Sequence, residues 1–181
     1  TPDLKRPSTA MLIQKRLNIG EDCLVFDVNL GCSGYTAGIQ IVAALLHSVG
    51  GKGLLVVGDA IYVPMEDGIT PDDLLFGAGS SATAISVEDG YPMIYGQKSD
   101  GKGFDVLMAT LDGRTFMDGK GVLMFGLNQV ADSIKELKEE YKLKEESIDY
   151  YIFHQAQKLI INGIANECAI NLEKVLNSYE D

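Results

Sequence analysis

The sequence predicts an α/β fold, because short apolar segments typical of buried strands alternate with longer segments of helical periodicity. Glycine-rich turns separate the two kinds of segment, so a strand–turn–helix order repeats along the chain. The predicted strands are 23–28, 54–58, a strand of small residues that ends at Val87, and 149–153. The predicted helices are 8–18, 35–49, 123–141 and 156–169.

The helix predicted at 35–49 is the most apolar of these segments. Its polar members are few, and apolar side chains surround it, so we expect it to be buried on nearly every side. Gly34 and Gly38 share one face of the helix and would let another element approach closely. Gly50 and the glycine after it are expected to end the helix.

The helices predicted at 8–18 and 123–141 carry clear sequence signals. Ser8 or Thr9 is expected to cap the first, because a hydroxyl oxygen can accept from the unpaired N–H groups of a first turn. The second has apolar residues at steps of three and four, and its charged last turns are expected to face solvent. These apolar residues are Leu123, Leu127, Val130, Ile134, Leu137 and Tyr141.

The middle of the chain is predicted to contain a buried strand followed by loops. Segment 54–58 (LLVVG) is apolar without alternation, which is typical of a strand in a parallel sheet. An acidic loop is expected at 64–73, and a glycine-rich turn then leads into the strand of small residues within 74–87. Segment 88–104 is rich in glycine and is expected to form turns and short strands.

Composition limits the classes of function. The 181 residues can form a domain with a real core, and 46% hydrophobic with 23% charged residues is typical of soluble globular proteins. A net charge of −11 argues against nucleic acid binding, which needs a basic surface. No segment has the roughly 18 to 20 apolar residues that span a bilayer, and no signal peptide is visible. Three irregularly spaced cysteines suggest a reducing cytoplasm, and no metal-binding pattern occurs.

Cys32 is the first candidate for a reactive side chain. It lies in the run GCSG at 31–34, at the start of a predicted helix, where unpaired N–H groups and the helix dipole favour an anion. This position would favour the thiolate, and the flanking glycines leave room for a substrate. From spacing alone, a buried structural cysteine is the commoner explanation, and it is our interpretation of Cys23 and Cys168.

His154 is the second candidate, because it directly follows a predicted strand, where open α/β sheets place their active sites. An imidazole there could donate to an oxyanion or exchange protons near neutral pH. A histidine satisfied in the core is the structural alternative, and we interpret His47 as structural. The run FGAGS at 76–80 lacks the ending of a phosphate loop and leads into a strand, so a nucleotide site is rejected. Its glycines are expected to permit close backbone packing beneath a site.

Five segments match, in order, the motifs of one enzyme family. Segment 26–35 (FDVNLGCSGY) is similar to its nucleophile segment, and 55–59 (LVVGD) is similar to the strand that follows. Segment 76–79 (FGAG) is similar to its Phe-Gly-Asp-Gly loop, and 117–122 (MDGKGV) to its Met-x-Gly turn before a helix. Segment 152–156 (IFHQA) resembles its His-Gln-Ala motif. The chain thus resembles the ketoacyl-carrier-protein synthase III family of the thiolase superfamily.

The resemblance implies a thiolase-like fold layered αβαβα, of which 1–97 would be the remainder of the N-terminal half and 98–181 the first part of the C-terminal half. It implies an acyltransferase of fatty-acid or polyketide-type biosynthesis, in which Cys32 takes an acyl group from a primer thioester. His154, with an Asn, would stabilise the enolate formed when a malonyl thioester loses CO₂, and the product would be a 3-oxoacyl thioester.

The same resemblance implies binding residues and partners. Substrate or carrier contacts are expected from Gln155, Gln157, Lys158, Gly77 and Gly79. The primer would be an acyl-CoA or an acyl-carrier-protein, and the donor malonyl-carrier-protein. No cofactor or metal is expected beyond the coenzyme A or phosphopantetheine of the substrates, and a cytoplasmic homodimer without nucleic acid or membrane partners is expected.

The chain departs from the family pattern in three respects. The family's catalytic Asn and C-terminal glycine-rich strand would lie beyond Asp181, and its N-terminal part before Thr1, so we expect these residues alone to be inactive. An acidic stretch at 69–73 replaces an Arg that contacts coenzyme A, and Leu159 next to Lys158 replaces an Arg that contacts the carrier. Acidic loops would repel phosphate and an acidic carrier, so the primer and donor stay open.

Two other functions stay open. A Cys–His hydrolase or acyltransferase would hydrolyse its acyl-Cys32 and need no malonyl donor. CO₂ release coupled to carbon–carbon bond formation would exclude it. A non-catalytic partner subunit could keep the fold, although such relatives usually lose the nucleophile that this chain retains. A stoichiometric complex with a separate active synthase would favour that function.

Overall fold

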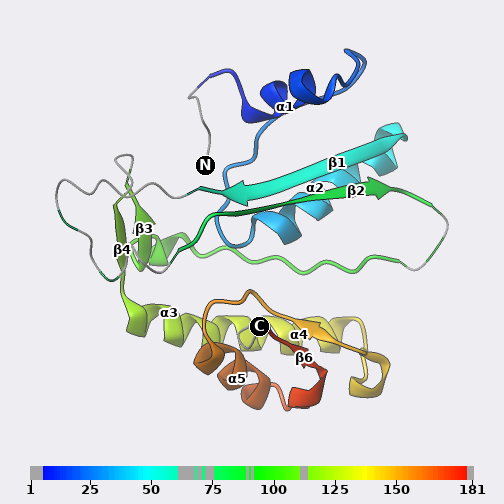
Figure 1. The fold of residues 1–181 in the computed structure, drawn as a ribbon. Helices are drawn as coiled ribbons and strands as arrows, with labels where there is room; N and C mark the ends of the chain where they lie inside the picture. The colour runs from blue at the N-terminus through cyan, green and yellow to red at the C-terminus, as the bar shows by residue number, and fades with distance from the viewer. Residues whose placement is uncertain are drawn as a thin grey trace. The chain divides into compact units, whose positions relative to one another are not determined.

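The computed structural model describes residues 6–60, 68, 71, 76–88, 90, 92–110 and 114–178. The chain divides into two compact units, Thr1–Tyr62 with Leu74–Met93 and Val63–Asp73 with Ile94–Asp181. Figure 1 shows the helices and strands of both units. Most of the acidic loop predicted at 64–73 lies outside the described residues.

The first unit is built on a two-stranded antiparallel sheet with a helix against it. β1 (Lys52–Asp59) pairs with β2 (Gly79–Ser86) over its full length, from Lys52 opposite Ser86 to Asp59 opposite Gly79. α2 (Gly34–Val49) packs against this pair (Figure 1). Side chains alternate along most of β1 between exposed and half-buried positions, as expected for a sheet covered on one face.

α2 confirms the predicted helix but not its predicted burial. Gly38 is buried, and a Cβ there would lie 2.7 Å from Leu55 Cδ1, so the predicted close approach is confirmed at this residue. Gly50 ends the helix with φ of +74°. Apart from Gly38, Leu46 is the one residue of α2 that is buried, and Val49 is 78% exposed. The other side chains of α2 are half-buried or exposed.

Two strand predictions in this unit are wrong. Segment 23–28 forms no strand and Leu24 is exposed, because no strand among the described residues pairs with this segment. β1 runs antiparallel to β2, although the apolar run at 54–58 predicted a parallel sheet. The predicted burial of this strand is also wrong, because Leu54 and Val56 are 45% and 42% exposed. An apolar run does not determine the direction of the neighbouring strand. The strand of small residues after the glycine-rich turn is confirmed as β2.

α1 (Thr9–Leu17) confirms the helix predicted at 8–18, but its cap differs from the prediction. Ser8 holds the N-cap position, yet its side chain makes no capping bond with a described residue. Instead, the Asp27 carboxylate accepts from the backbone N–H groups of Thr9 (2.6 Å) and Ala10 (2.8 Å). Desolvation acts to raise the pKa of Asp27, but these hydrogen bonds outweigh it and lower the pKa below its ordinary value. Asp27 therefore ties the segment that leads to Cys32 to the start of α1.

The second unit contains a long helical stretch from 119 to 140. It consists of α3 (Gly119–Phe125), the π-helical turn η4 (Gly126–Val130) and α4 (Ala131–Glu140), and it confirms the helix predicted at 123–141. The Asp118 side chain caps its start by accepting from Lys120 N at 3.1 Å. α5 (Lys158–Glu167) confirms the helix predicted at 156–169 and packs on η4.

Short strands complete the second unit. β3 (Leu107–Ala109) pairs antiparallel with β4 (Thr115–Met117). β5 (Tyr151–Ile152) pairs parallel with β6 (Val175–Leu176), and β5 is shorter than the predicted strand 149–153. The 3₁₀ turns are η3 (Gly101–Gly103), η5 (Glu145–Ser147) and η6 (Leu172–Lys174).

The core of the second unit lies between α5 and the parallel strand pair. Its buried residues are Ile161, Ala165, Ile170 and Val175, with Tyr151, Phe153 and Cys168 packed against them. Glycines permit the close packing of α5 on η4, because a Cβ at Gly126 would lie 2.8 Å from Ile160 Cγ2. This packing holds one end of β5, and with it the chain that leads to His154.

A polar cluster joins α4 to β5. Lys138 Nζ donates to Glu145 Oε2 at 2.8 Å, and the Tyr151 hydroxyl donates to the same oxygen at 2.7 Å. The hydrogen bonds from Lys138 and Tyr151 lower the pKa of Glu145. Lys174 Nζ donates to the carbonyls of Glu145 and Ile148, each at 2.7 Å. Charged hydrogen bonds thus hold η5, β5 and the end of η6 together.

Neither a membrane-spanning helix nor a metal-binding cluster occurs among the described residues. Each described helix falls short of the length and apolarity needed to cross a bilayer. Within the same part of the chain, no three His, Cys, Asp or Glu side chains come together in a way that could hold a metal ion.

Candidate active site

Cys32 lies in the turn immediately before α2. The helix takes Ser33 as its N-cap residue, so Cys32 stands one position further out and is exposed to solvent. Gly34 N donates to Gly31 O at 2.8 Å and closes the turn around the thiol-bearing residue. The predicted placement of Cys32 at a helix start is confirmed, and the alternative of a buried structural cysteine is wrong for this residue.

The glycine before Cys32 leaves the approach to the turn open. Among the described residues, a Cβ at Gly31 would meet no heavy atom within 4 Å, and a Cβ at Gly34 would meet only Leu30 Cβ, at 3.8 Å. On the helix side, Thr36 Oγ1 donates to Ser33 O at 3.1 Å and fixes the first turn. The turn therefore combines a fixed backbone with little crowding from described atoms at its two glycines.

The other two cysteines differ in burial. Cys23, interpreted above as a buried structural residue, is instead exposed, and its Sγ donates to Gly20 O at 3.2 Å. Cys168 fits the structural interpretation, because it packs against the core and its Sγ donates to Ala131 O at 3.5 Å. Desolvation raises the pKa of the Cys168 thiol, which disfavours its thiolate.

His154 lies just after β5, on the segment that joins this strand to α5. It is exposed, and its carbonyl accepts from Ala156 N at 2.9 Å in a tight turn. Phe153, the residue before it, packs against the core of the second unit. The predicted placement of His154 at a strand end is confirmed.

Gln155 has both ends of its side-chain amide engaged by the main chain. Nε2 donates to Phe153 O at 2.9 Å and to Leu176 O at 3.4 Å. Oε1 accepts from Ser178 N at 3.1 Å. These bonds link the residues that follow β5 with Leu176, the last residue of β6, and with Ser178 beyond it. The predicted substrate contact of Gln155 stays a prediction.

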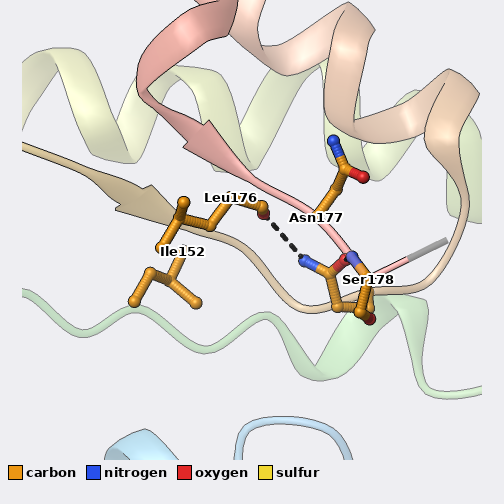
Figure 2. Close-up of a pocket in the computed structure, with 5 residues that line it drawn as sticks. Ile152, Leu176, Asn177 and Ser178 are labelled. Atoms are coloured by element: carbon orange, nitrogen blue, oxygen red, sulfur yellow. Dashed lines mark hydrogen bonds between the residues drawn. The ribbon is translucent and has the colours of Figure 1, made fainter. Parts of the chain in front are cut away.

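A pocket of about 240 Å³ opens beside Gln155. Figure 2 shows Ile152 and Leu176 on one side of it, with Asn177 and Ser178 following along the chain. The dashed line in the same view is the bond from Gln155 to Leu176 O. The surface that lines the pocket is almost entirely apolar, and Ile152 and Leu176 at the ends of the two strands contribute to it.

The other predicted binding residues are placed as follows. Gln157 is the N-cap residue of α5, and its carbonyl accepts from Ile161 N at 3.1 Å. Lys158 is the first residue of that helix and is exposed. At Gly77 and Gly79, a Cβ would meet no described atom within 4 Å, so the predicted close backbone packing is not seen among the described residues. The roles of these residues in binding stay predictions.

The structure brings some of the predicted residues together. His154, Gln155, Gln157 and Lys158 lie together on the segment between β5 and α5, in the second unit. Cys32 belongs to the first unit. Its pairing with His154 therefore stays a prediction.

The sequence reasoning missed the residues that share the pocket with Gln155. Asn177 and Ser178 line it, together with Ile152 and Leu176. The available signal was the apolar pair at 175–176, which forms β6 in parallel register with β5. A strand of two residues is too short for periodicity to reveal it.

The sequence was compared with known proteins, and no family model matches it. It is 30% identical to the beta-ketoacyl-[acyl-carrier-protein] synthase III of Neisseria gonorrhoeae, over 100% of this chain and 60% of that protein. It is also 30% identical to the protein of the same name from Neorickettsia sennetsu, over 97% of this chain and 57% of that protein. The chain thus spans about three fifths of the length of these curated relatives.

Solved structures show the same likeness. The crystal structure of 3-oxoacyl-(acyl carrier protein) synthase III from Pseudomonas aeruginosa PAO1 matches with a TM-score of 0.87 at 25% identity, over 98% of this chain and 58% of that one. The predicted thiolase-like α/β fold is therefore confirmed. The resemblance that the five motifs predicted is confirmed along the chain.

Proposed function

We propose, from the similarity of this chain to the beta-ketoacyl-[acyl-carrier-protein] synthase III family, that it carries reactive groups of an acyltransferase that performs a decarboxylative Claisen condensation. The observation that carries the proposal is the position of Cys32. The residue stands exposed at the start of α2, within the segment that matches the family's nucleophile motif.

Cys32 would act first, as the acyl acceptor. Its thiolate attacks the carbonyl carbon of a primer thioester, and the tetrahedral intermediate expels the carrier thiolate, which leaves an acyl-Cys32 thioester. The N-terminus of α2 supports this step, since N–H groups and the helix dipole favour negative charge near the sulfur. The glycines around the turn leave space for the carrier arm.

His154 would act in the second step, on the malonyl donor. Its imidazole donates a hydrogen bond to the thioester oxygen while the bond between the α-carbon and the carboxylate breaks and CO₂ leaves. The resulting carbanion attacks the acyl-Cys32 carbonyl, a carbon–carbon bond forms, and the Cys32 sulfur leaves as thiolate. The product is a 3-oxoacyl thioester on the donor's carrier.

The substrates and setting belong to the same proposal. The primer is an acyl-CoA or acyl-carrier-protein and the donor malonyl-carrier-protein, in fatty-acid or polyketide-type biosynthesis. Gln157 and Lys158, which are exposed at the start of α5, would contact a carrier arm. Gly77, which precedes β2, and Gly79, its first residue, would take part in the same binding. We further propose that the protein works in the cytoplasm as a homodimer.

Labelling with a radioactive primer tests the proposal. The complete gene product is incubated with labelled acyl-CoA or acyl-carrier-protein, and bound label is counted after denaturation. Label is expected on Cys32 and should be absent in Cys32→Ala. The matched control is Cys23→Ala, which removes another exposed thiol and should label normally. Label that survives in Cys32→Ala would refute the proposal.

Adding the malonyl donor separates condensation from hydrolysis. A condensing enzyme releases CO₂ in step with 3-oxoacyl product, whereas a Cys–His hydrolase releases the labelled acid whether or not the donor is present. Release of the labelled acid without CO₂ and without a 3-oxoacyl product would show that the protein is a Cys–His hydrolase and would refute the proposal.

A further inference from the structure

The Gln155 amide is engaged at both ends by main-chain groups of separate segments. Its nitrogen donates to carbonyls of Phe153 and Leu176, and its oxygen accepts from the N–H of Ser178. Leu176 and Ser178 lie 21 and 23 residues further along the chain. One side chain therefore joins the residues after β5 to the last residue of β6 and to Ser178 beyond it. Figure 2 draws the bond to Leu176 O as a dashed line.

These bonds begin where the strand ladder ends. β5 and β6 pair over two residues each, and Ile152 opposite Leu176 is the last pair. A ladder of this length is weak by itself, because each backbone hydrogen bond contributes little net free energy. The Gln155 amide adds links to Leu176 O and Ser178 N at this end, so it continues the junction of the two segments past the ladder.

His154 lies in the chain between Phe153, whose carbonyl Gln155 holds, and Gln155 itself. The carbonyl before it, that of Phe153, accepts from Gln155 Nε2, and its own carbonyl accepts from Ala156 N in the following turn. Phe153 is also packed on the core. The backbone on both sides of His154 is therefore held in place, and with it the Cα atom from which the imidazole extends.

The chemistry of the contacts requires an amide. The site presents two carbonyl oxygens and one N–H, so it needs two donors and an acceptor on one planar group. Glutamate would place a carboxylate oxygen against two carbonyls, and methionine would keep the shape without any hydrogen bond.

We infer that Gln155 is a positioning residue for His154, and that it acts by locking the segment after β5 to the segment after β6. The inference rests on the proposed function, in which His154 assists decarboxylation of the donor. It assigns to Gln155 a structural link to the main chain in place of a substrate contact. Loss of the link should impair the step that uses His154 and leave acyl transfer to Cys32 intact.

The test compares Gln155→Met with Gln129→Met in the complete gene product. Gln129 lies exposed in η4 and is the matched control. With histidine labelled by ¹³C, and signals assigned by substitution, the His154 imidazole signal should shift or broaden in Gln155→Met while that of His47 in α2 stays unchanged. Acylation of Cys32 should stay within about twofold of the wild type, and donor decarboxylation should fall by about tenfold or more, as expected when a positioned hydrogen-bond donor is lost.

A measurement on the wild type needs no substitution. The side-chain amide protons of Gln155 should exchange with solvent at least about fivefold more slowly than those of Gln129, the factor that one net hydrogen bond supplies. Equal exchange rates, or a Gln155→Met protein with an unmoved His154 signal and normal decarboxylation, would overturn the inference. His154→Ala separates the two proposals, because normal condensation in that variant would remove the proposed role of His154, whereas slow exchange at Gln155 would still show the link.

Discussion

Replacing Asp27 by alanine should detach the start of α1 from the segment that leads to Cys32. Its carboxylate accepts two backbone N–H bonds, from Thr9 and Ala10, that a first helical turn otherwise leaves unpaired. Removing a capping side chain costs about 0.5–2 kcal/mol. The substitution also removes the negative charge of Asp27 near the N-terminus of α1, where the first turn has no acidic residue of its own. Losing this interaction with the helix dipole costs about 0.3–1 kcal/mol more. Because Asp27 is exposed, we expect about 1–2 kcal/mol less free energy of unfolding.

Urea unfolding followed by circular dichroism measures this change, and Ser8→Ala is the matched control. Ser8 occupies the N-cap position without a side-chain capping bond, so its replacement should change the free energy of unfolding by less than about 0.5 kcal/mol. Faster hydrogen exchange at the amides of Thr9 and Ala10 should accompany the loss in Asp27→Ala. A Ser8→Ala variant as destabilised as Asp27→Ala would refute the reasoning.

The pH dependence of this difference gives a second check. The pKa of Asp27 is lowered in the folded chain, so its contribution is fully present above the unfolded pKa of about 3.9. The contribution is lost as pH falls through the lower, folded pKa. The gap in stability between wild type and Asp27→Ala should therefore be constant near neutral pH and shrink below about pH 4. A gap that widens in acid would contradict the assigned bonds.

Three further predictions concern packing, thiol reactivity and the polar cluster. In urea unfolding, Gly58→Ala should lower the free energy of unfolding by about 1–3 kcal/mol, because the new Cβ would lie 2.9 Å from a carbonyl oxygen of β2. Gly101→Ala is the control, because its Cβ would meet no described atom within 4 Å and should change the free energy of unfolding little. Iodoacetamide should modify Cys168 about tenfold more slowly than Cys23, because desolvation raises the pKa of the Cys168 thiol and packing covers the side chain. Intact-mass spectrometry follows both reactions, and equal rates would contradict the placement of Cys168 in the core. Glu145→Ala should lower the free energy of unfolding by about 1–3 kcal/mol near neutral pH, because the partly buried Lys138 and Tyr151 lose their hydrogen-bond partner. Since the pKa of Glu145 is lowered in the folded chain, this loss should become smaller in acid; thermal unfolding measures it, and an unchanged stability would exclude the role of Glu145.

Helix positions were predictable because their signals are local. Glycine after the apolar run ended α2 at Gly50, where φ is positive, and steps of three and four residues indicated the long stretch that starts after Asp118. The cap of α1 was not predictable in the same way. Its partner, Asp27, lies 17 and 18 residues away from the N–H groups it accepts, and a capping rule considers only adjacent residues.

Strands were harder to predict, since a strand depends on a neighbour that the pattern does not contain. Segment 23–28 is as apolar as a strand, yet no described strand pairs with it. The direction of β1 follows from β2, whose small residues gave no sign of antiparallel pairing. At the site, the sequence predicted the positions of Cys32 at a helix start and of His154 at a strand end. The bonds of Gln155 were not, because they join segments more than 20 residues apart.

The transfer of one acyl group from Cys32 to the donor tests the central claim most directly. The complete gene product is first acylated with an acyl-CoA, freed of excess primer, and mixed with malonyl-carrier-protein, and the mass of the peptide that contains Cys32 is followed over time. The acyl group should disappear from Cys32 while CO₂ and 3-oxoacyl product form in equal amounts. In His154→Ala, the acyl group should persist on Cys32. Loss of the acyl group as free acid at the same rate without the donor, or normal transfer in His154→Ala, would contradict the account.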